Sequence, residues 1–224
     1  MALGAMLAFA APLRAENRSC SGPDLTGLQP VEVGRIRGSA TRVNLIRGGD
    51  KAAQCPDASL SCQERAYLVP GDLVVLGGKL NNFVCADYPN AKNVRAGWLP
   101  DGAIEPVAFE TSPGAFAGKW SRVEATIEIA FKDGVLRAVG EATWGAFDPD
   151  RVKRGSVNVG NFDGALAFHD GVALFSEAAG ANEPDPYSCH VRLTMADKVL
   201  IVQDNNQCGG ANVSFTGYYF RAPK

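Results

Sequence analysis

Residues 123–131 alternate between apolar and polar side chains, and this pattern constrains the fold more than any other feature of the sequence. The apolar positions are Val123, Ala125, Ile127, Ile129 and Phe131, and Glu124, Thr126 and Glu128 lie between them. A period of two is typical of a β-strand with one buried and one solvated face. Lys132-Asp133-Gly134 follows and predicts a hairpin turn into a second strand over residues 135–144. The segment therefore predicts an antiparallel sheet.

The rest of the second half continues in short apolar runs separated by turn residues such as His169-Asp170-Gly171. The further strands are expected at residues 155–159, 164–168, 172–176, 187–195, 199–203 and 213–220. Eight antiparallel strands in up-and-down order can close into a barrel without exposed edges, and an open two-sheet sandwich is the alternative. We predict this barrel as a domain over residues 118–224.

The first half also consists of short apolar runs between turn residues, among them Pro70-Gly71-Asp72 and Gly77-Gly78. The expected strands are residues 31–35, 41–46, 66–69, 73–76, 82–86 and 96–99. Such close spacing predicts a small barrel or sandwich domain over residues 16–107. Residues 108–117 contain Thr111-Ser112-Pro113-Gly114 and predict a linker between the two domains.

Four runs of the first domain resemble the bacterial SH3-like (SH3b) family. They are residues 43–47 (VNLIR), 66–72 (AYLVPGD), 83–88 (FVCADY) and 97–100 (GWLP). The resemblance implies a small SH3-like barrel in which the Gly-Trp-Leu run closes the barrel, and it implies binding of peptidoglycan or proteins. The cysteine-bearing insert, residues 54–62, departs from the family pattern. The predicted fold class is therefore all-β, with a small SH3-like barrel followed by an eight-stranded antiparallel up-and-down barrel, stabilised by disulfides.

The last part of the chain, residues 204–221, resembles the end of uncharacterised secreted bacterial β-barrel modules, some of which accompany lysozyme-inhibitor-like proteins. Residues 1–15 predict a signal peptide, because a short apolar run precedes Ala10 and Ala15, small residues that signal peptidases accept. We therefore expect a periplasmic or secreted bacterial protein. No apolar run approaches the roughly 20 residues of a membrane-spanning helix, so the chain is predicted not to span a membrane.

The even number of cysteines behind an export signal predicts disulfides. The six are Cys20, Cys55, Cys62, Cys85, Cys189 and Cys208. Their spacing predicts Cys189–Cys208 in the second domain. In the first domain we expect Cys55–Cys62 with Cys20–Cys85, and Cys20–Cys62 with Cys55–Cys85 is the alternative.

The residues that usually carry catalysis do not form a recognisable set in this sequence. His190 is expected on the polar face of its strand and His169 in a hairpin turn. Asp148 and Asp150 lie in a Pro-containing loop, where aspartate favours local hydrogen bonds. The net charge of -2 gives no support for nucleic-acid binding. We predict a chain that is not an enzyme and that uses no cofactor or metal.

Two polar segments are candidate partner-binding surfaces. One comprises Asp204, Asn205, Asn206 and Gln207, and the other comprises Arg151, Lys153 and Arg154. A disulfide-stapled loop and a solvated basic loop are the simpler interpretations. The leading functional hypothesis is non-catalytic binding of an envelope protein or a peptidoglycan fragment, and inhibition of a wall-degrading enzyme by a stiff loop is one form of it.

Two other functions are weighed against binding. In the first, the chain is a small-molecule carrier whose barrel cavity is lined by Ala138 and Gly140, with Trp144 at its mouth. Tight packing of these small residues is the simpler interpretation. In the second, the chain is a cell-wall hydrolase, although no catalytic motif is assembled. The oligomeric state is left open by the sequence.

Overall fold

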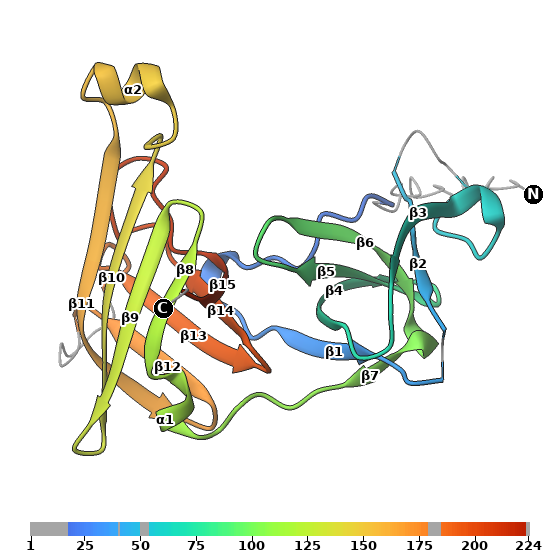
Figure 1. The fold of residues 1–224 in the computed structure, drawn as a ribbon, viewed down its shortest axis with the longest axis horizontal. Helices are drawn as coiled ribbons and strands as arrows, with labels where there is room; N and C mark the ends of the chain where they lie inside the picture. The colour runs from blue at the N-terminus through green and yellow to red at the C-terminus, as the bar shows by residue number, and fades with distance from the viewer. Residues whose placement is uncertain (1–17, 40, 50–53, 179–184, 223–224) are drawn as a thin grey trace, which may run out of the picture.

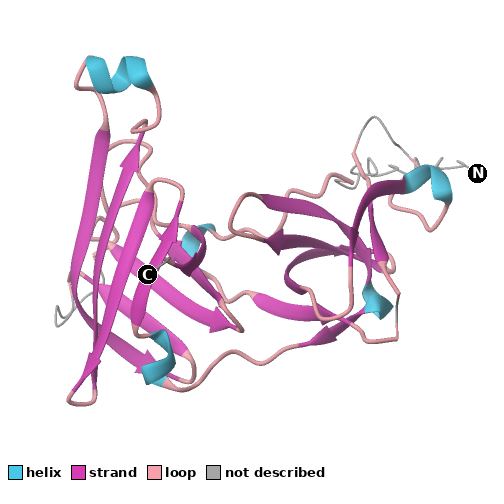
Figure 2. Ribbon diagram, in the orientation of Figure 1, coloured by secondary structure: helices cyan, strands magenta, loops and turns pink. Residues whose placement is uncertain are grey.

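Two antiparallel β-structures follow one another along the chain (Figures 1 and 2). The computed structural model describes residues 18–39, 41–49, 54–178 and 185–222. The predicted signal peptide, residues 1–15, lies outside these ranges. No helix among the described residues is long and apolar enough to cross a membrane.

The first structure is a seven-stranded sheet in the order β3-β2-β6-β5-β4-β1-β7. Its strands are β1 (Glu32–Ile36), β2 (Val43–Ile46), β3 (Gln63–Leu68), β4 (Leu73–Leu80), β5 (Phe83–Pro89), β6 (Val94–Pro100) and β7 (Ile104–Pro106). The short 3-10 helices η1 (Thr26–Leu28), η3 (Leu60–Cys62) and η4 (Asp101–Ala103) lie in its connections. Six of these strands match predicted ones, and the SH3-like resemblance stays a prediction.

Gly77 and Gly78 were expected in a turn, but they lie inside β4. The pairing of β4 with β5 shifts register between Leu76 and Lys79, which is how the strand continues through the two glycines. A Cβ atom at Gly77 would lie 3.0 Å from the carbonyl oxygen of Gly22. Gly77 is therefore needed because the N-terminal arm, residues 18–31, passes close to β4 at this point.

The second structure is a closed barrel in which each strand pairs with its neighbours in sequence and the last strand pairs with the first. Its strands are β8 (Gly118–Arg122), β9 (Ala125–Lys132), β10 (Val135–Trp144), β11 (Asn158–His169), β12 (Val172–Ser176), β13 (His190–Ala196), β14 (Val199–Asp204) and β15 (Gly217–Arg221). The predicted eight-stranded, antiparallel, up-and-down barrel is confirmed.

Two of the predicted barrel strands are wrong in detail. Residues 155–159 and 164–168 were expected as separate strands, whereas β11 runs through both regions as one strand. Gly160 and Gly164 are typical of a turn in the sequence, but in the structure each is a glycine because a neighbouring group leaves no room for a side chain. A Cβ atom at Gly164 would lie 2.7 Å from the ring of Phe175, and one at Gly160 would lie 2.4 Å from the carbonyl oxygen of Cys208. The eighth strand is β8, which the sequence analysis did not identify as a strand.

Aromatic rings pack inside the barrel against the small residues of β10. The ring centroid of Phe162 lies 5.0 Å from that of Phe175 and 4.9 Å from that of Phe215. A Cβ atom at Gly140 would lie 2.2 Å from the Phe162 ring, and Ala138 is fully buried. Ala138 and Gly140 therefore belong to a packed core, the simpler of the two interpretations of the sequence, and they do not line a ligand cavity.

The end of the predicted linker belongs to the barrel. Helix α1 (Pro113–Phe116) carries the fully buried Phe116, whose ring meets that of Phe168 edge-on at 5.4 Å. The indole nitrogen of Trp120 donates to the carbonyl oxygen of Phe116 at 2.8 Å. This single turn is held against the barrel core and is not a free connector.

A shared apolar core joins the sheet to the barrel. It contains Val31, which directly precedes β1, with Val33, Leu73 and Val75 of the sheet and Ala196, Val199, Ile201 and Tyr218 of the barrel. Two side-chain contacts cross the same interface: Tyr218 Oη donates to Asp87 Oδ2 at 2.7 Å, and Arg35 pairs with Asp197 at 2.6 Å. Burial of this apolar surface fixes the two units relative to each other.

Candidate functional site

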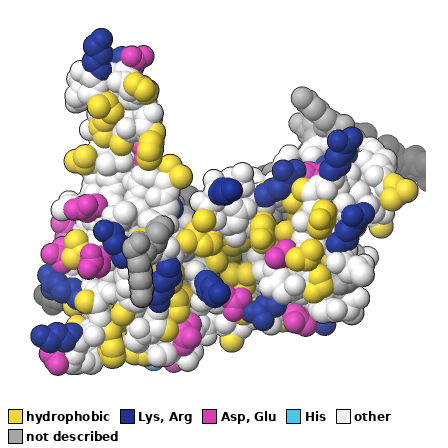
Figure 3. Space-filling model, in the orientation of Figure 1, with side chains coloured by type: hydrophobic (Ala, Val, Ile, Leu, Met, Phe, Trp, Pro, Cys, Tyr) yellow, Lys and Arg dark blue, Asp and Glu magenta, His cyan; other side chains and the backbone are white. Residues whose placement is uncertain are grey.

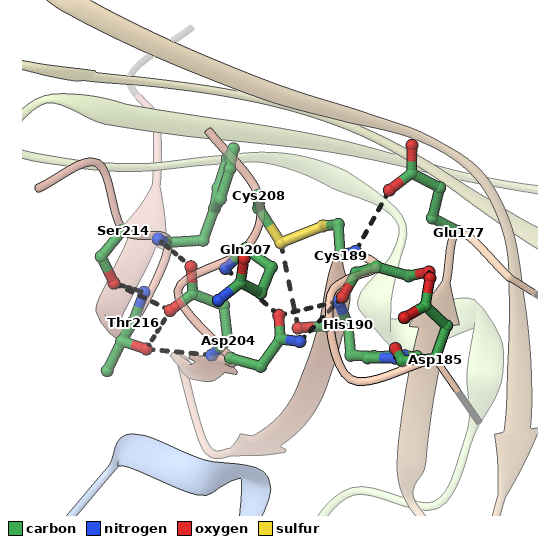
Figure 4. Close-up of a disulfide and its surroundings, with 12 residues drawn as sticks. Glu177, Asp185, Cys189, His190, Asp204, Gln207, Cys208, Ser214 and Thr216 are labelled. Carbon is green, nitrogen blue, oxygen red and sulfur yellow. Dashed lines mark hydrogen bonds between the residues drawn. A yellow bond between two sulfur atoms is a disulfide. The ribbon is translucent and has the colours of Figure 1, made fainter. Parts of the chain in front are cut away.

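The first predicted binding segment, residues 204–207, is mostly a structural element. Asp204 is fully buried. Its carboxylate accepts hydrogen bonds from Ser214 Oγ at 2.8 Å, Thr216 Oγ1 at 2.6 Å and the backbone nitrogen of Phe215 at 3.0 Å (Figure 4). It is therefore not available to a partner, which corrects the prediction for this residue. The carboxylate instead holds the segment that leads into β15.

Asn205 has a similar role beside the disulfide. Its Oδ1 accepts from the backbone nitrogen of His190 at 3.0 Å, and its Nδ2 donates to the carbonyl oxygen of Ser188 at 2.8 Å. Asn206 and Gln207 are exposed. Asn205 itself is half-buried, so only two of the four predicted residues are fully exposed and the segment offers little area to a partner.

The disulfide beside this segment joins Cys189 to Cys208, as predicted (Figure 4). The other two disulfides are Cys20–Cys85 and Cys55–Cys62, the pairing that the sequence analysis favoured. Cys189 and Cys208 are both buried at the edge of the barrel core. Together with the Asp204 hydrogen bonds, the bridge acts as a staple for the chain between β14 and β15.

The second predicted segment lies at the tip of the β10–β11 hairpin, which projects beyond the rest of the barrel (Figure 1). Helix α2 (Pro149–Lys153) forms the tip. Asp148 caps the helix by accepting from the backbone nitrogens of Asp150 at 2.9 Å and Arg151 at 3.2 Å. The Asp148 carboxylate therefore serves as the N-terminal cap of α2.

Arg151 and Trp144 brace the tip from below. The guanidinium carbon of Arg151 lies 3.7 Å from the centre of the Trp144 ring. Gly145 has a φ of +86°, and a Cβ atom there would lie 2.5 Å from Arg151 Cδ. The backbone nitrogen of Ala146 donates to Glu124 Oε1 at 2.7 Å, which ties the tip to the β8–β9 turn. Trp144 and Arg151 are therefore occupied with each other, and neither is a free binding group.

The tip exposes apolar side chains between charged ones (Figure 3). Phe147 is 76% exposed, and Val152 of α2 and Val159 of β11 are exposed as well. Lys153 and Arg154 are exposed on the same helix and its end. The sequence analysis identified the basic residues and missed Phe147. The sequence feature that could have identified Phe147 is an aromatic residue directly before the Asp-Pro pair that begins a helix. Neither the helix cap nor the first helical turn needs an aromatic residue at that position.

Each of the two histidines contacts a nearby aspartate. His169 lies at the surface, paired at 3.0 Å with Asp170, and the Nε2 atom of His190 lies 2.9 Å from the carbonyl oxygen of Asp185. Hydrogen bonds from Tyr187 and Ser188 lower the pKa of the Asp185 carboxyl. No group of three potential metal ligands occurs among residues that the structure describes.

A cleft of about 440 Å³ lies between the sheet and the barrel. The β5–β6 turn forms one wall, and residues of β15 and of the β8–β9 turn form the other. At its base, burial raises the pKa of the Asp87 carboxyl, although the hydrogen bond from Tyr218 acts in the opposite direction. Burial also raises the pKa of Tyr218, so its hydroxyl remains a donor.

The raised pKa of Asp87 predicts a pH-dependent contribution to stability. A carboxyl whose pKa is higher in the folded than in the unfolded state stabilises the fold below its unfolded pKa, and this contribution is lost as pH rises through the folded pKa. Asp87→Asn keeps the shape and the Tyr218 hydrogen bond but removes the titration. We expect the melting temperature of the variant, relative to wild type, to rise between pH 4 and pH 7.

Asp133→Asn is the matched control, because Asp133 is exposed and its left-handed backbone suits asparagine. Thermal melts of the three proteins across this pH range measure the effect. A difference between Asp87→Asn and wild type that stays constant with pH would contradict the prediction.

Comparison with known protein families, curated proteins and solved structures gives no match for this chain.

Proposed function

We propose that this chain is a non-catalytic binding protein of the bacterial cell envelope that presents the β10–β11 tip to a protein partner. The observation that carries the proposal is the exposed Phe147 on a braced, projecting tip, beside Val152 and the cations of Lys153 and Arg154. Aromatic residues and arginine are enriched in protein interfaces.

The bracing of the tip supports binding by a preformed surface. Asp148 caps α2, Arg151 stacks on Trp144, and Glu124 holds the backbone of Ala146. A tip that is already ordered loses little conformational entropy on binding. Its chemistry fits a partner with an apolar pocket and an acidic rim, and insertion into the cleft of a wall-degrading enzyme is one form of such binding.

The location in the envelope rests on two observations. Disulfides persist in oxidising compartments outside the cytoplasm, and the described chain contains three of them. Residues 1–15 have the sequence pattern of a signal peptide. The proposal includes a second interaction, in which the sheet binds peptidoglycan or an envelope protein. It is supported by the resemblance of the first unit to the SH3-like family.

The test uses Phe147 as a crosslinking position and as a mutation site. With p-benzoylphenylalanine in place of Phe147, ultraviolet irradiation in an envelope extract is expected to give a discrete adduct, and the same residue in place of Val135 is not. Val135 is the matched control because it is also an exposed apolar residue but lies at the other end of β10. Purified peptidoglycan is tested in parallel by sedimentation.

Phe147→Ser is expected to weaken binding to the crosslinked partner by tenfold or more, since an aromatic anchor contributes about 2 kcal/mol or more. Val135→Ser is expected to leave the affinity unchanged. Both melting temperatures should match wild type, because exposed substitutions typically change stability by less than about 0.5 kcal/mol. Equal partner affinity for wild type and Phe147→Ser would show that the tip is not the binding surface.

A further inference from the structure

The cleft between the sheet and the barrel is a second candidate site, separate from the tip. It has a volume of about 440 Å³, within the range of roughly 300–1,000 Å³ that small-molecule sites occupy. Figure 3 shows hydrophobic side chains gathered in the hollow between the two units. The apolar lining residues are Leu25, Ala91, Val94, Val123, Tyr218 and Phe220.

The walls of the cleft are fixed before any ligand arrives. Leu25, Tyr218 and Phe220 take part in the apolar core that joins the two units. The Tyr218–Asp87 hydrogen bond crosses the base of the cleft at 2.7 Å. Asn90 Oδ1 accepts from the backbone nitrogens of Lys92 and Asn93 at 3.0 and 3.2 Å, which shapes the β5–β6 turn. A preformed site binds without a large ordering cost.

Two cations border the apolar walls. Lys92 is exposed on the β5–β6 turn, and the Arg122 guanidinium lies at the end of β8. Arg122 donates to the carbonyl oxygens of Val123, at 2.7 Å, and Ser214. Neither cation has a carboxylate partner within the described ranges of the chain.

The one acidic residue that lines the cleft is Asp87, and it is buried at the base with Tyr218 as its partner. Lys92 and Arg122 therefore outnumber the carboxylates among the residues that line the cleft. The cleft lining therefore combines apolar walls with an excess of positive charge.

We propose that the cleft binds a small amphipathic anion, with an aromatic or short acyl body against Val94, Val123 and Phe220 and one acidic group toward Lys92 and Arg122. Charge complementarity selects this class. A neutral apolar ligand would leave the two cations unused, a cation would be repelled by them, and a purely polar anion would leave the apolar walls in contact with water. This site goes beyond the proposed function, because it uses none of the residues of the tip.

Two dyes with the same ring skeleton test the proposal. 1-Anilinonaphthalene-8-sulfonate carries the anionic group, and N-phenyl-1-naphthylamine lacks it. Fluorescence titration of the folded protein is expected to show saturable binding of the sulfonate, weakened by salt, and at least fivefold weaker binding of the amine. Equal affinity for the two dyes would overturn the assignment of an anion.

Lys92→Glu is expected to weaken sulfonate binding about fivefold, since reversal of an exposed charge changes an interaction by about 1 kcal/mol. Lys132→Glu makes the same charge change at the far end of β9, on another exposed lysine without an ion-pair partner in the part of the chain that the structure describes, and should have no effect. Arg122 is left unchanged because its hydrogen bonds support the fold. Equal weakening by both variants would show a general charge effect and would overturn the site.

Val94→Glu provides a second test from the apolar wall. It places a carboxylate inside the cleft at an exposed position, and it is expected to abolish sulfonate binding and to weaken amine binding. Val139→Glu is the matched control on the outer face of β10, where Val139 is similarly exposed. Unchanged dye binding by Val94→Glu, with a wild-type melting temperature, would place the dye elsewhere and overturn the proposal.

Discussion

Trp98→Ala is expected to lower the free energy of unfolding by about 3–5 kcal/mol, the usual cost of removing a large buried aromatic ring. Trp98 is only 3% exposed. It packs with Ile46, Leu80 and both disulfides of the first unit. Its indole nitrogen also donates to the carbonyl oxygen of Arg18 at 2.9 Å, which ties the N-terminal arm to β6. Removal of the ring therefore loses packing and a long-range hydrogen bond together.

Trp98→Phe separates these two contributions. It keeps much of the ring but loses the hydrogen bond to Arg18, so a smaller loss of about 1–2 kcal/mol is expected. Trp144→Ala is the control at a half-buried tryptophan in the barrel. Urea unfolding followed by circular dichroism measures all three variants. A wild-type midpoint for Trp98→Ala would contradict the packing described for β6, and it would also remove support for the SH3-like resemblance, in which the Gly-Trp-Leu run closes the barrel.

Asp204→Ala is expected to lower the free energy of unfolding by about 3 kcal/mol or more. The substitution leaves the hydroxyls of Ser214 and Thr216 and the backbone nitrogen of Phe215 without their acceptor. Each unsatisfied buried donor typically costs about 1–3 kcal/mol. The segment that these bonds hold includes the fully buried Phe215, so loosening it also disturbs the barrel core.

Gln207→Ala is the matched control in the same polar run, because the Gln207 side chain is exposed. Its stability is expected to lie within about 0.5 kcal/mol of wild type. Asp204→Asn should fall between the two, since one of its two oxygen acceptors becomes a donor. Thermal and urea unfolding measure the series. If Asp204→Ala were as stable as Gln207→Ala, the carboxylate would not be the support that its contacts indicate.

Local patterns in the sequence were sufficient for the strands and turns that depend only on near neighbours. The alternation at Ala125, Ile127 and Ile129 fixes which face of β9 is buried, because successive side chains of a strand point to opposite sides. Asp133-Gly134 both adopt positive φ angles, of 53° and 80°, as the predicted hairpin turn requires. The Cys189–Cys208 bridge also followed from spacing, because these two cysteines are remote from the other four.

The bounds of individual strands were harder to predict from sequence, because a glycine can mark a turn or can lie inside a strand where a neighbour packs closely. Gly160 and Gly164 have the composition of a turn, but in β11 they make room for Cys208 and Phe175, which are far away in sequence. Asp204 lies in a polar run that is typical of an exposed loop. Its hydrogen-bond partners at residues 214–216 instead hold it in a buried position. In each case the deciding neighbour comes from another strand.

The sequence by itself therefore determined the all-β class and the Cys189–Cys208 bridge, because these rest on period, turn chemistry and spacing along the chain. It favoured a closed barrel and the Cys20–Cys85 and Cys55–Cys62 pairs over their alternatives, and the structure decided both. Only the tertiary structure decided which surfaces remain for binding. The exposure of Phe147 depends on how far the β10–β11 hairpin projects, and the cleft exists only because apolar faces of two separate units pack together. Such surfaces depend on contacts between residues distant in sequence, and the spacing of side chains along one strand carries no information about them.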